Sequence, residues 1–267
     1  MYKYEGLLIH QSHDDQGIIE IVDLAGVRAL HFGSSSQQSS MLLSDPDRLH
    51  ALYARAMMAG LLFHDTPHNV LMIGLGGGSI AKFLLQQFAD CKIKAIEFRR
   101  HVLKVARSHF GLPLDARLKV KIGCGAQHAY QESREHQELY DLIVIDAYDA
   151  EGMAPEVSSA GFFDNCRTLL SSKGMLIINL WATDKPLLEQ VTWHLERSFA
   201  ERLLFLPVRT RGNIIGFAFG PQKPKPDLKA LQTKARDLEQ RYQLEFPSYM
   251  LDIKRHNHHT LNRVINT

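Results

Sequence analysis

Residues Asn69 to Phe83 read NVLMIGLGGGSIAKF, and the rest of the chain is most easily interpreted from this stretch. An apolar, β-favouring run from Asn69 to Ile73 stops at glycine, and from Ser79 the apolar residues recur at helical spacing. This pattern predicts a buried strand, a tight glycine turn and a helix. Bare glycines let a ligand approach the backbone, and the free N–H groups of the first helical turn face it. The stretch therefore predicts a site for the polar part of a nucleotide or nucleoside.

Strand-like and helix-like segments alternate along the chain after this turn. Strand patterns follow at residues 92–98, 117–123, 140–149, 174–181, 202–208 and 213–220, and helical patterns lie at 80–88, 100–110, 126–136, 159–170 and 185–199. Repeated β-α units that end in an antiparallel hairpin are typical of a doubly wound fold. We therefore predict an α/β protein with a mostly parallel, Rossmann-like sheet of seven strands.

Smaller units are predicted on both sides of this sheet. Residues 1–44 contain short apolar runs that indicate a small β-hairpin region, which the polar link Ser34 to Ser40 closes. The main catalytic domain is predicted over residues 45–220 and begins with a helix capped by Asp45. Residues 221–267 are expected to form a C-terminal helix and tail.

Composition limits the possible partners and locations. The chain of 267 residues carries 31 Lys and Arg against 29 Asp and Glu, which is too even a balance for nucleic acid or an acidic membrane as the principal partner. Its three cysteines show no CxxC spacing, and no apolar run reaches about 18 residues. We therefore expect a soluble cytoplasmic protein with neither a metal site nor a membrane span.

Glu97 strengthens the nucleoside interpretation of the glycine turn. The dinucleotide fingerprint G-x-G-x-x-G is incomplete here, because Gly74 and Gly76 are followed by Ser79 in the third position. A glycine turn alone can be purely structural. A carboxylate at the end of the next strand, however, can accept hydrogen bonds from both hydroxyls of a ribose. The alternative is a solvated carboxylate at a strand end.

Asp146 and Asp149 form a second candidate constellation, in the sequence IVIDAYD. The apolar strand before them brings both to its carboxyl end, which is the edge where ligands bind in an open parallel sheet. Two carboxylates beside a cationic sulfonium would stabilise it and could take a proton from an incoming nucleophile. The alternative is that Asp149 caps the following loop and Asp146 bonds to backbone at the strand end.

The segments VLMIGLGGGS, AIEFRRHVLKVARSHFG, KVKIG, YDLIVIDAYD and GMLIINLW follow one another in a familiar order and spacing. From Asn69 to about Gly220 the chain resembles the spermidine synthase (polyamine aminopropyltransferase) family, which has the class I AdoMet-dependent methyltransferase fold. The resemblance implies AdoMet or decarboxylated AdoMet as donor substrate, a small-molecule acceptor and a homo-oligomer. It also implies a gate loop at Ala150–Ser159 that closes over the acceptor.

The resemblance further assigns roles to individual residues. Asp149 would be the general base, with Asp146 beside it. The donor would contact Gly74, Gly76, Gly77, Gly78, Glu97, Cys124 and Gln38, and the acceptor would contact Tyr53, Arg55, Tyr148 and Trp181.

Four of these positions depart from the family pattern. Gly77 replaces an aspartate that binds the amine of decarboxylated AdoMet, and Cys124 replaces one that reads adenine. Arg55 and Trp181 stand where acidic residues bind the polyamine. An arginine would reverse the sign of a diamine site, since an unpaired buried ammonium costs several kcal/mol. Glycine at position 77 would leave room for the carboxylate of AdoMet itself.

These departures lead to a functional hypothesis with two alternatives. The first expectation is methyl transfer from AdoMet to an acceptor that is not a polyamine. The second is true aminopropyl transfer from decarboxylated AdoMet to putrescine, and the third is a nucleoside-binding protein without catalysis.

Overall fold

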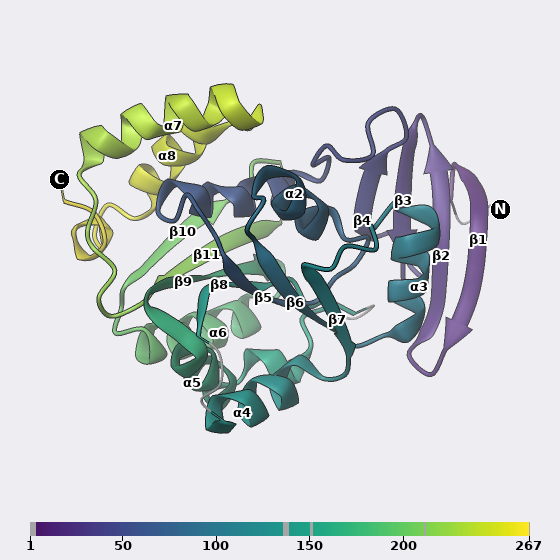
Figure 1. The fold of residues 1–267 in the computed structure, drawn as a ribbon, viewed down its shortest axis with the longest axis horizontal. Helices are drawn as coiled ribbons and strands as arrows, with labels where there is room; N and C mark the ends of the chain where they lie inside the picture. The colour runs from purple at the N-terminus through teal and green to yellow at the C-terminus, as the bar shows by residue number, and fades with distance from the viewer. Residues whose placement is uncertain (1–3, 136–138, 150–151, 211, 267) are drawn as a thin grey trace.

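The computed structural model describes residues 4–135, 139–149, 152–210 and 212–266, and Figure 1 shows the path of the chain. Its central sheet contains seven strands in the order β10-β11-β9-β8-β5-β6-β7. Their bounds are β5 (Asn69–Ile73), β6 (Lys92–Glu97), β7 (Leu118–Ile122), β8 (Tyr140–Ile145), β9 (Leu170–Trp181), β10 (Leu203–Pro207) and β11 (Asn213–Phe219). Strands β5 to β9 pair in parallel, whereas β11 pairs antiparallel with both β9 and β10. The predicted doubly wound, mostly parallel sheet is therefore confirmed.

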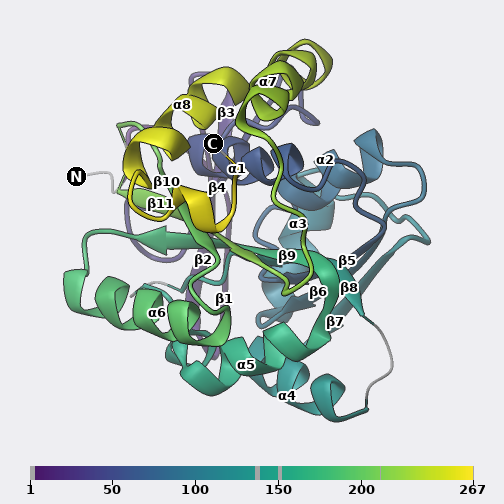
Figure 2. The same ribbon diagram turned by 90° about the vertical axis from the view of Figure 1, so that its left-hand side faces the viewer.

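Helices cover both faces of this sheet, because its strands are apolar on both sides. On β5, Val70 and Met72 belong to one core cluster, whereas Leu71 and Ile73 belong to another. The first cluster includes residues of α1 (Leu52–Met57), the 3-10 helix η1 (Met58–Leu62), α2 (Ser79–Gln87), α7 (Leu228–Tyr242) and α8 (Phe246–His256). The second includes residues of α4 (Gly125–Glu135), α5 (Ala160–Leu169) and α6 (Lys185–Ser198), which lie on the opposite face in Figure 2.

A separate antiparallel sheet forms from the N-terminal residues. It has the order β1-β2-β3-β4, with β1 (Leu7–Asp14), β2 (Gly17–Leu24), β3 (Val27–His31) and β4 (Gln37–Leu42). Its apolar face packs on α3 (Arg100–His109), where Ile21 and Leu30 share a cluster with Val102 and Val105. At the rim of this contact, the Arg99 side chain donates to the Asp14 carboxylate at 2.7 and 3.0 Å.

Two local predictions were wrong, and one helix was missed. Ser34 to Ser40 was expected to be a link, but residues from Gln37 belong to β4, whose serines are buried although their side chains are polar. The helix expected from Asp45 begins only at Leu52, with Ala51 as its N-cap. Helix α8 was not predicted.

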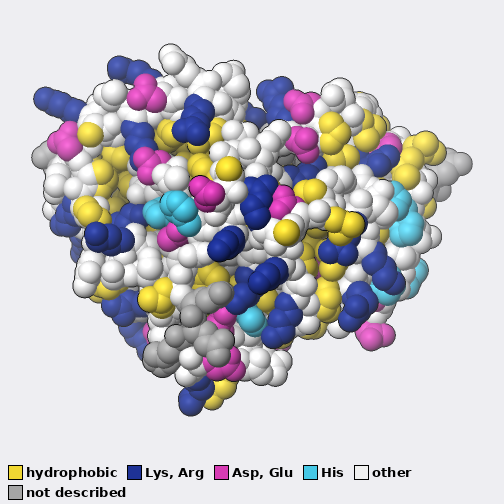
Figure 3. Space-filling model, viewed as in Figure 1, with side chains coloured by type: hydrophobic (Ala, Val, Ile, Leu, Met, Phe, Trp, Pro, Cys, Tyr) yellow, Lys and Arg dark blue, Asp and Glu magenta, His cyan; other side chains and the backbone are white. Residues whose placement is uncertain are grey.

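Some predictions fall partly outside the described residues. These are the helix at 126–136, which includes His136, and the gate loop, which includes Ala150 and Glu151. None of the helices in the described ranges has the length and apolar character that a membrane crossing requires. On the face shown in Figure 3, basic and acidic side chains are interspersed.

Candidate functional site

The glycine turn joins β5 to α2 at the carboxyl edge of the sheet. Gly74 has a φ of +92°, and a Cβ there would lie 2.1 Å from the carbonyl oxygen of Asp146. Only glycine therefore permits this close approach of the two strand ends. The turn and the end of β8 consequently lie side by side, as the sequence predicted.

Side chains of neighbouring elements lie close to Gly77. A Cβ at this position would lie 2.7 Å from Oγ of Ser39 and 2.9 Å from Cδ1 of Phe110. The space beside Gly77 is thus filled by β4 and by the residue that ends α3. A side chain at this position would therefore meet Ser39 and Phe110, while the expectation that glycine leaves room for a donor carboxylate stays a prediction.

Glu97 closes the turn from the end of β6. Its Oε2 accepts the N–H of Leu75 at 3.0 Å, and its Oε1 accepts the N–H of Arg99 at 2.8 Å. Burial raises the pKa of Glu97, whereas the backbone hydrogen bonds of Arg99, Leu75 and Gly76 act in the opposite direction. A carboxylate has about four lone-pair positions, and three backbone N–H groups use most of them, so about one position remains for a ligand hydroxyl. Glu97 is therefore not a solvated strand-end residue.

Asp146 follows the end of β8 and is held by neutral donors. Its Oδ1 accepts Nδ2 of Asn179 on β9 at 2.9 Å, and the Tyr53 hydroxyl, which donates to the Gln38 carbonyl at 3.1 Å, lies nearby. Burial raises the pKa of Asp146, because these neutral partners do not compensate fully for lost hydration. In turn, burial and the Asp146 charge raise the pKa of Tyr53. Because its partners among the described residues carry no charge, a cation could pair with this half-buried carboxylate.

Asp149 stands three residues further along. Its backbone N–H donates to the carbonyl of Gly152 at 2.9 Å, and its Oδ1 accepts the N–H of Gly152 at the same distance. The capping alternative is therefore part of its role. Gln38 of β4 donates through Nε2 to the Asp149 carbonyl at 3.4 Å, and the Gln38 carbonyl accepts the Tyr53 hydroxyl. Strand β4 thus lies over this edge of the sheet.

Asp149 also lines a cavity of about 260 Å³. Its aromatic wall is formed by Tyr148 and Trp181, whose ring centroids are 5.7 Å apart, and the Tyr148 hydroxyl donates to the Asn179 carbonyl. The remaining described residues of its lining are Gly152, Met153, Pro155, Leu180, Thr183, Asp184, Leu187, Leu188 and Val191. Asp184 also caps α6 by accepting the N–H of Leu187 at 3.0 Å. The described lining thus contains two carboxylates and neither lysine nor arginine.

Arg55 is turned toward the C-terminal segment instead of this cavity. Its guanidinium is buried and donates to the carbonyls of Leu49 and Gln243 and to both oxygens of Glu245, at distances of 2.6–3.2 Å. Its charge is therefore paired inside the protein. The expectation that Arg55 reverses the sign of the acceptor site does not hold, since the carboxylate of Glu245 neutralises it.

Cys124 lies just after β7 and is half-buried, and its thiol is free. The backbone N–H of the preceding residue, Gly123, donates to the Glu97 carbonyl at 3.0 Å. Cys124 is therefore one residue away from a direct contact with Glu97. Among the described residues, no group of three or more His, Cys, Asp or Glu side chains could hold a metal ion.

Sequence reasoning missed three residues of this site. Ser39 comes from a stretch interpreted as a link, and its Oγ lies 3.4 Å from that of Ser79. Asn179 is a buried polar residue inside an apolar strand, which is a signal that could have been used. Asp184 precedes Lys185-Pro186 at a helix start, so its cap was readable, but its place in the cavity was not.

The fold and the carboxylate-lined edge define a nucleoside-binding transferase built on the AdoMet-methyltransferase type of sheet. The spermine/spermidine synthase domain matches residues 51–209 of the chain. The polyamine aminopropyltransferase of Chromobacterium violaceum is 33% identical over 92% of this chain and 93% of its own length. That of Neisseria meningitidis serogroup A is 32% identical over 90% of both chains. The chain belongs to the spermine/spermidine synthase family.

A solved structure supports the fold independently. The crystal structure of a spermidine synthase with the transition-state analogue AdoDATO has a TM-score of 0.69 and covers 96% of this chain and 88% of its own, at 19% identity. The family membership shown by the domain match and the curated relatives makes the protein a transferase with an AdoMet-type donor. Our first expectation, methyl transfer to an acceptor that is not a polyamine, was wrong, because the relatives that match nearly the whole chain are named aminopropyltransferases.

Proposed function

We propose that this protein transfers the aminopropyl group of decarboxylated AdoMet to a small aliphatic diamine such as putrescine. The observation that carries the proposal is the sign of the charges at the carboxyl edge of the sheet. Glu97, Asp146, Asp149 and Asp184 all supply carboxylates there, while the guanidinium of Arg55 is paired elsewhere. Both proposed substrates carry ammonium groups, which such an edge can pair.

The acceptor cavity also fits a diamine in its apolar parts. A chain of methylene groups can lie against Leu187, Leu188 and Val191, while its ammonium ends face Asp149 and Asp184. The half-exposed indole of Trp181, 39% accessible, can hold an ammonium over its face. The tryptophan that we first took to favour an aromatic acceptor therefore also suits a cation.

On the donor side, we infer that Asp146 binds the amine that an aspartate binds in the family pattern, where this chain has Gly77. A side chain at position 77 would collide with Ser39 and Phe110, so the donor amine needs another carboxylate. Asp146 is half-buried, bonded only to neutral groups among the described residues, and adjacent to Gly74. We assign the donor amine to it and a ribose hydroxyl to Glu97.

The reaction then needs one proton transfer and one displacement. The Asp149 carboxylate takes a proton from the attacking ammonium, which frees the nitrogen lone pair. That nitrogen forms a bond to the donor's propyl carbon while the C–S bond breaks, and the sulfur keeps the electron pair as neutral methylthioadenosine. Alignment of nitrogen, carbon and sulfur in a closed site can contribute about 7–11 kcal/mol.

The experiment is a product analysis with four substrate pairs. The purified protein is incubated with AdoMet or decarboxylated AdoMet, each with putrescine or with an uncharged alcohol of equal length. The proposal expects methylthioadenosine and an aminopropylated diamine from one pair only, decarboxylated AdoMet with putrescine. Formation of S-adenosylhomocysteine, or methylthioadenosine without an aminopropylated diamine, contradicts it.

We also propose that the protein acts as a homo-oligomer through its N-terminal sheet. Strand β1 is an edge strand, and it exposes Leu7, Leu8 and Ile9 at 68, 46 and 38%. An exposed apolar edge strand favours pairing with another chain. Light scattering after gel filtration tests this, and a monomer at micromolar concentration contradicts it. The cytoplasmic location expected from the cysteines stays a prediction.

A further inference from the structure

A second cavity lies at the amino-terminal edge of the central sheet, opposite the edge that carries Asp149. It has a volume of about 410 Å³, and its apolar part includes Phe63 and Phe219, whose rings meet edge to face at 5.1 Å. Four cationic or titratable side chains line it, and they come from separate parts of the chain: His64, Lys173, Lys223 and Lys234. No carboxylate lies among the described residues of its lining.

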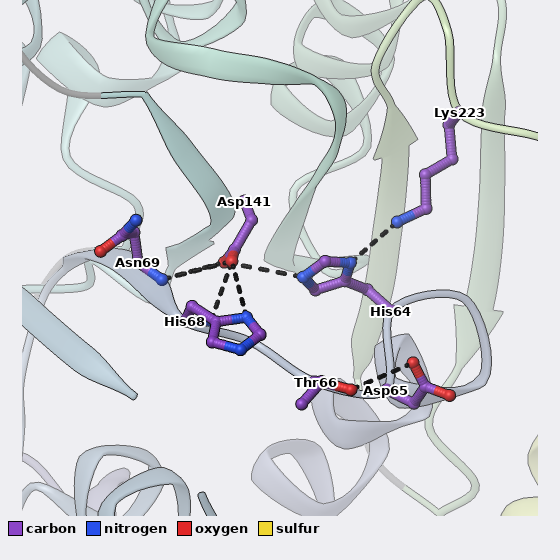
Figure 4. A network of polar contacts seen from close by, with 7 residues as sticks. All are labelled: His64, Asp65, Thr66, His68, Asn69, Asp141 and Lys223. Atoms are coloured by element: carbon purple, nitrogen blue, oxygen red, sulfur yellow. Dashed lines mark hydrogen bonds and ion pairs between the residues drawn. The ribbon is translucent and has the colours of Figure 1, made fainter. Parts of the chain in front are cut away.

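Figure 4 shows how Lys223 is held at this cavity. Its Nζ lies 3.0 Å from Nδ1 of His64, and Nε2 of that ring lies 3.6 Å from Oδ1 of Asp141. If the amine donates to Nδ1, the imidazole is neutral and carries its proton on Nε2, facing Asp141. Asp141 also accepts backbone N–H groups of His68 and Asn69. The hydrogen-bond partner of Lys223 is therefore a neutral ring, and the Asp141 carboxylate lies on the far side of that ring.

The other lysines leave the cavity with an excess of positive charge. Lys234 pairs with Asp65 at 3.1 Å, whereas Lys173 forms no ion pair with any described residue. Burial lowers the pKa of Lys223 to about 8, since the charges of Asp141 and Asp65 compensate only in part. An anion in the cavity would supply the missing counter-charge.

We propose that this cavity binds a small organic anion with an apolar body, of the class of aromatic carboxylates. The lysines would receive the carboxylate, and Phe63 with Pro224 and Pro226 would contact the ring. The volume lies within the usual range of small-molecule sites, about 300–1,000 Å³. A cationic polyamine is excluded from it by charge. The site is remote from the catalytic edge, so the proposal does not depend on aminopropyl transfer.

The test uses fluorine NMR with the full-length protein and 4-fluorobenzoate as the probe. The expected result is saturable broadening of the fluorine signal, with at least tenfold weaker binding of 4-fluorobenzyl alcohol, which has the same ring but no charge. Saturating methylthioadenosine should leave the binding unchanged. Equal binding of acid and alcohol, or displacement by methylthioadenosine, overturns the proposal.

Three variants locate the site. Lys223→Met removes the charge and should weaken binding of 4-fluorobenzoate at least tenfold. Lys229→Met should not, because Lys229 is an exposed residue at the start of α7 outside the cavity lining. Ala230→Phe fills the cavity from α7 without removing a charge, and it should also abolish binding. Ala230 is exposed, so this variant keeps the test valid if Lys223→Met does not fold. Undiminished binding in both cavity variants overturns the assignment.

Discussion

The guanidinium of Arg55 is paired with the carboxylate of Glu245, with 2.6 Å between Nη2 and Oε1. The two residues are 190 positions apart, and the pair joins α1 to the start of α8. Breaking such a pair leaves a buried cation without its partner, which destabilises a protein more than the loss of an exposed ion pair.

We expect Glu245→Gln to lower the free energy of unfolding by about 1–3 kcal/mol, because a hydrogen bond to a charged group contributes on that scale. Turnover of putrescine should change less than twofold, since Arg55 points away from the cavity. Urea denaturation and initial rates measure the two effects, with exposed Glu239→Gln as the control. A large gain or loss of diamine turnover without a stability change would show that Arg55 acts in the site.

The same pair predicts how stability depends on pH. Burial alone would raise the pKa of Glu245, but the hydrogen bonds of Arg55 and Tyr249 lower it. The stabilisation is therefore complete above the ordinary glutamate pKa and is lost as pH falls through the lowered folded-state value. The stability difference between wild type and Glu245→Gln should shrink in acid; a constant difference would contradict the assigned charge pairing.

Asp149→Asn should reduce kcat by about 10²–10⁴, the usual contribution of a general base. The amide oxygen can still accept the N–H of Gly152, so the thermal midpoint should stay within about 2 °C, because that contact survives. Release of methylthioadenosine measures the rate, and exposed Asp90→Asn is the matched control. Wild-type turnover in Asp149→Asn would remove this residue from the mechanism.

Asp184→Asn should raise KM for the diamine about fivefold and leave kcat nearly unchanged. An exposed ion pair contributes up to about 1 kcal/mol, which corresponds to that factor. Asparagine caps a helix as well as aspartate does, so stability should be retained, whereas Asp184→Ala should cost about 1 kcal/mol. Unchanged KM in both variants would show that the acceptor does not reach Asp184.

The acid limb of the pH–rate profile should depend on whether the donor is bound. Burial raises the pKa of Asp146, so in the free enzyme this carboxylate becomes protonated at a higher pH than that of an ordinary aspartate. A bound ammonium would lower that pKa again. We therefore expect the acid limb of kcat to lie at lower pH than that of kcat/KM for the donor.

Glu97 also has a raised pKa, so Asp146→Asn is needed to assign the limb. In this variant kcat/KM should fall, and the separation between the two limbs should shrink. An unaltered separation would assign the effect to Glu97 or to another group.

The strand, glycine turn and helix around residues 69–83 were predictable because their signals are local: apolar periodicity and glycine spacing. Strand β4 was not, because its Gln and Ser residues carry no β signal, and the burial of Ser39 and Ser40 depends on tertiary packing. The pairing of Arg55 with Glu245 was equally hidden, since side-chain partners far apart in sequence depend on tertiary packing. The inference that Arg55 reverses the charge of the acceptor site therefore failed, because its partner Glu245 could not be identified from the sequence.

Strand β4 carries Ser39 against Gly77 and Gln38 against the backbone of Asp149. A polar strand of the N-terminal sheet therefore covers the glycine turn of the central sheet. The N-terminal sheet is therefore not a separable accessory, because its strand β4 packs directly on the carboxyl edge of the central sheet. A change in the length of the connection before β4 would therefore shift the side chains that contact the glycine turn.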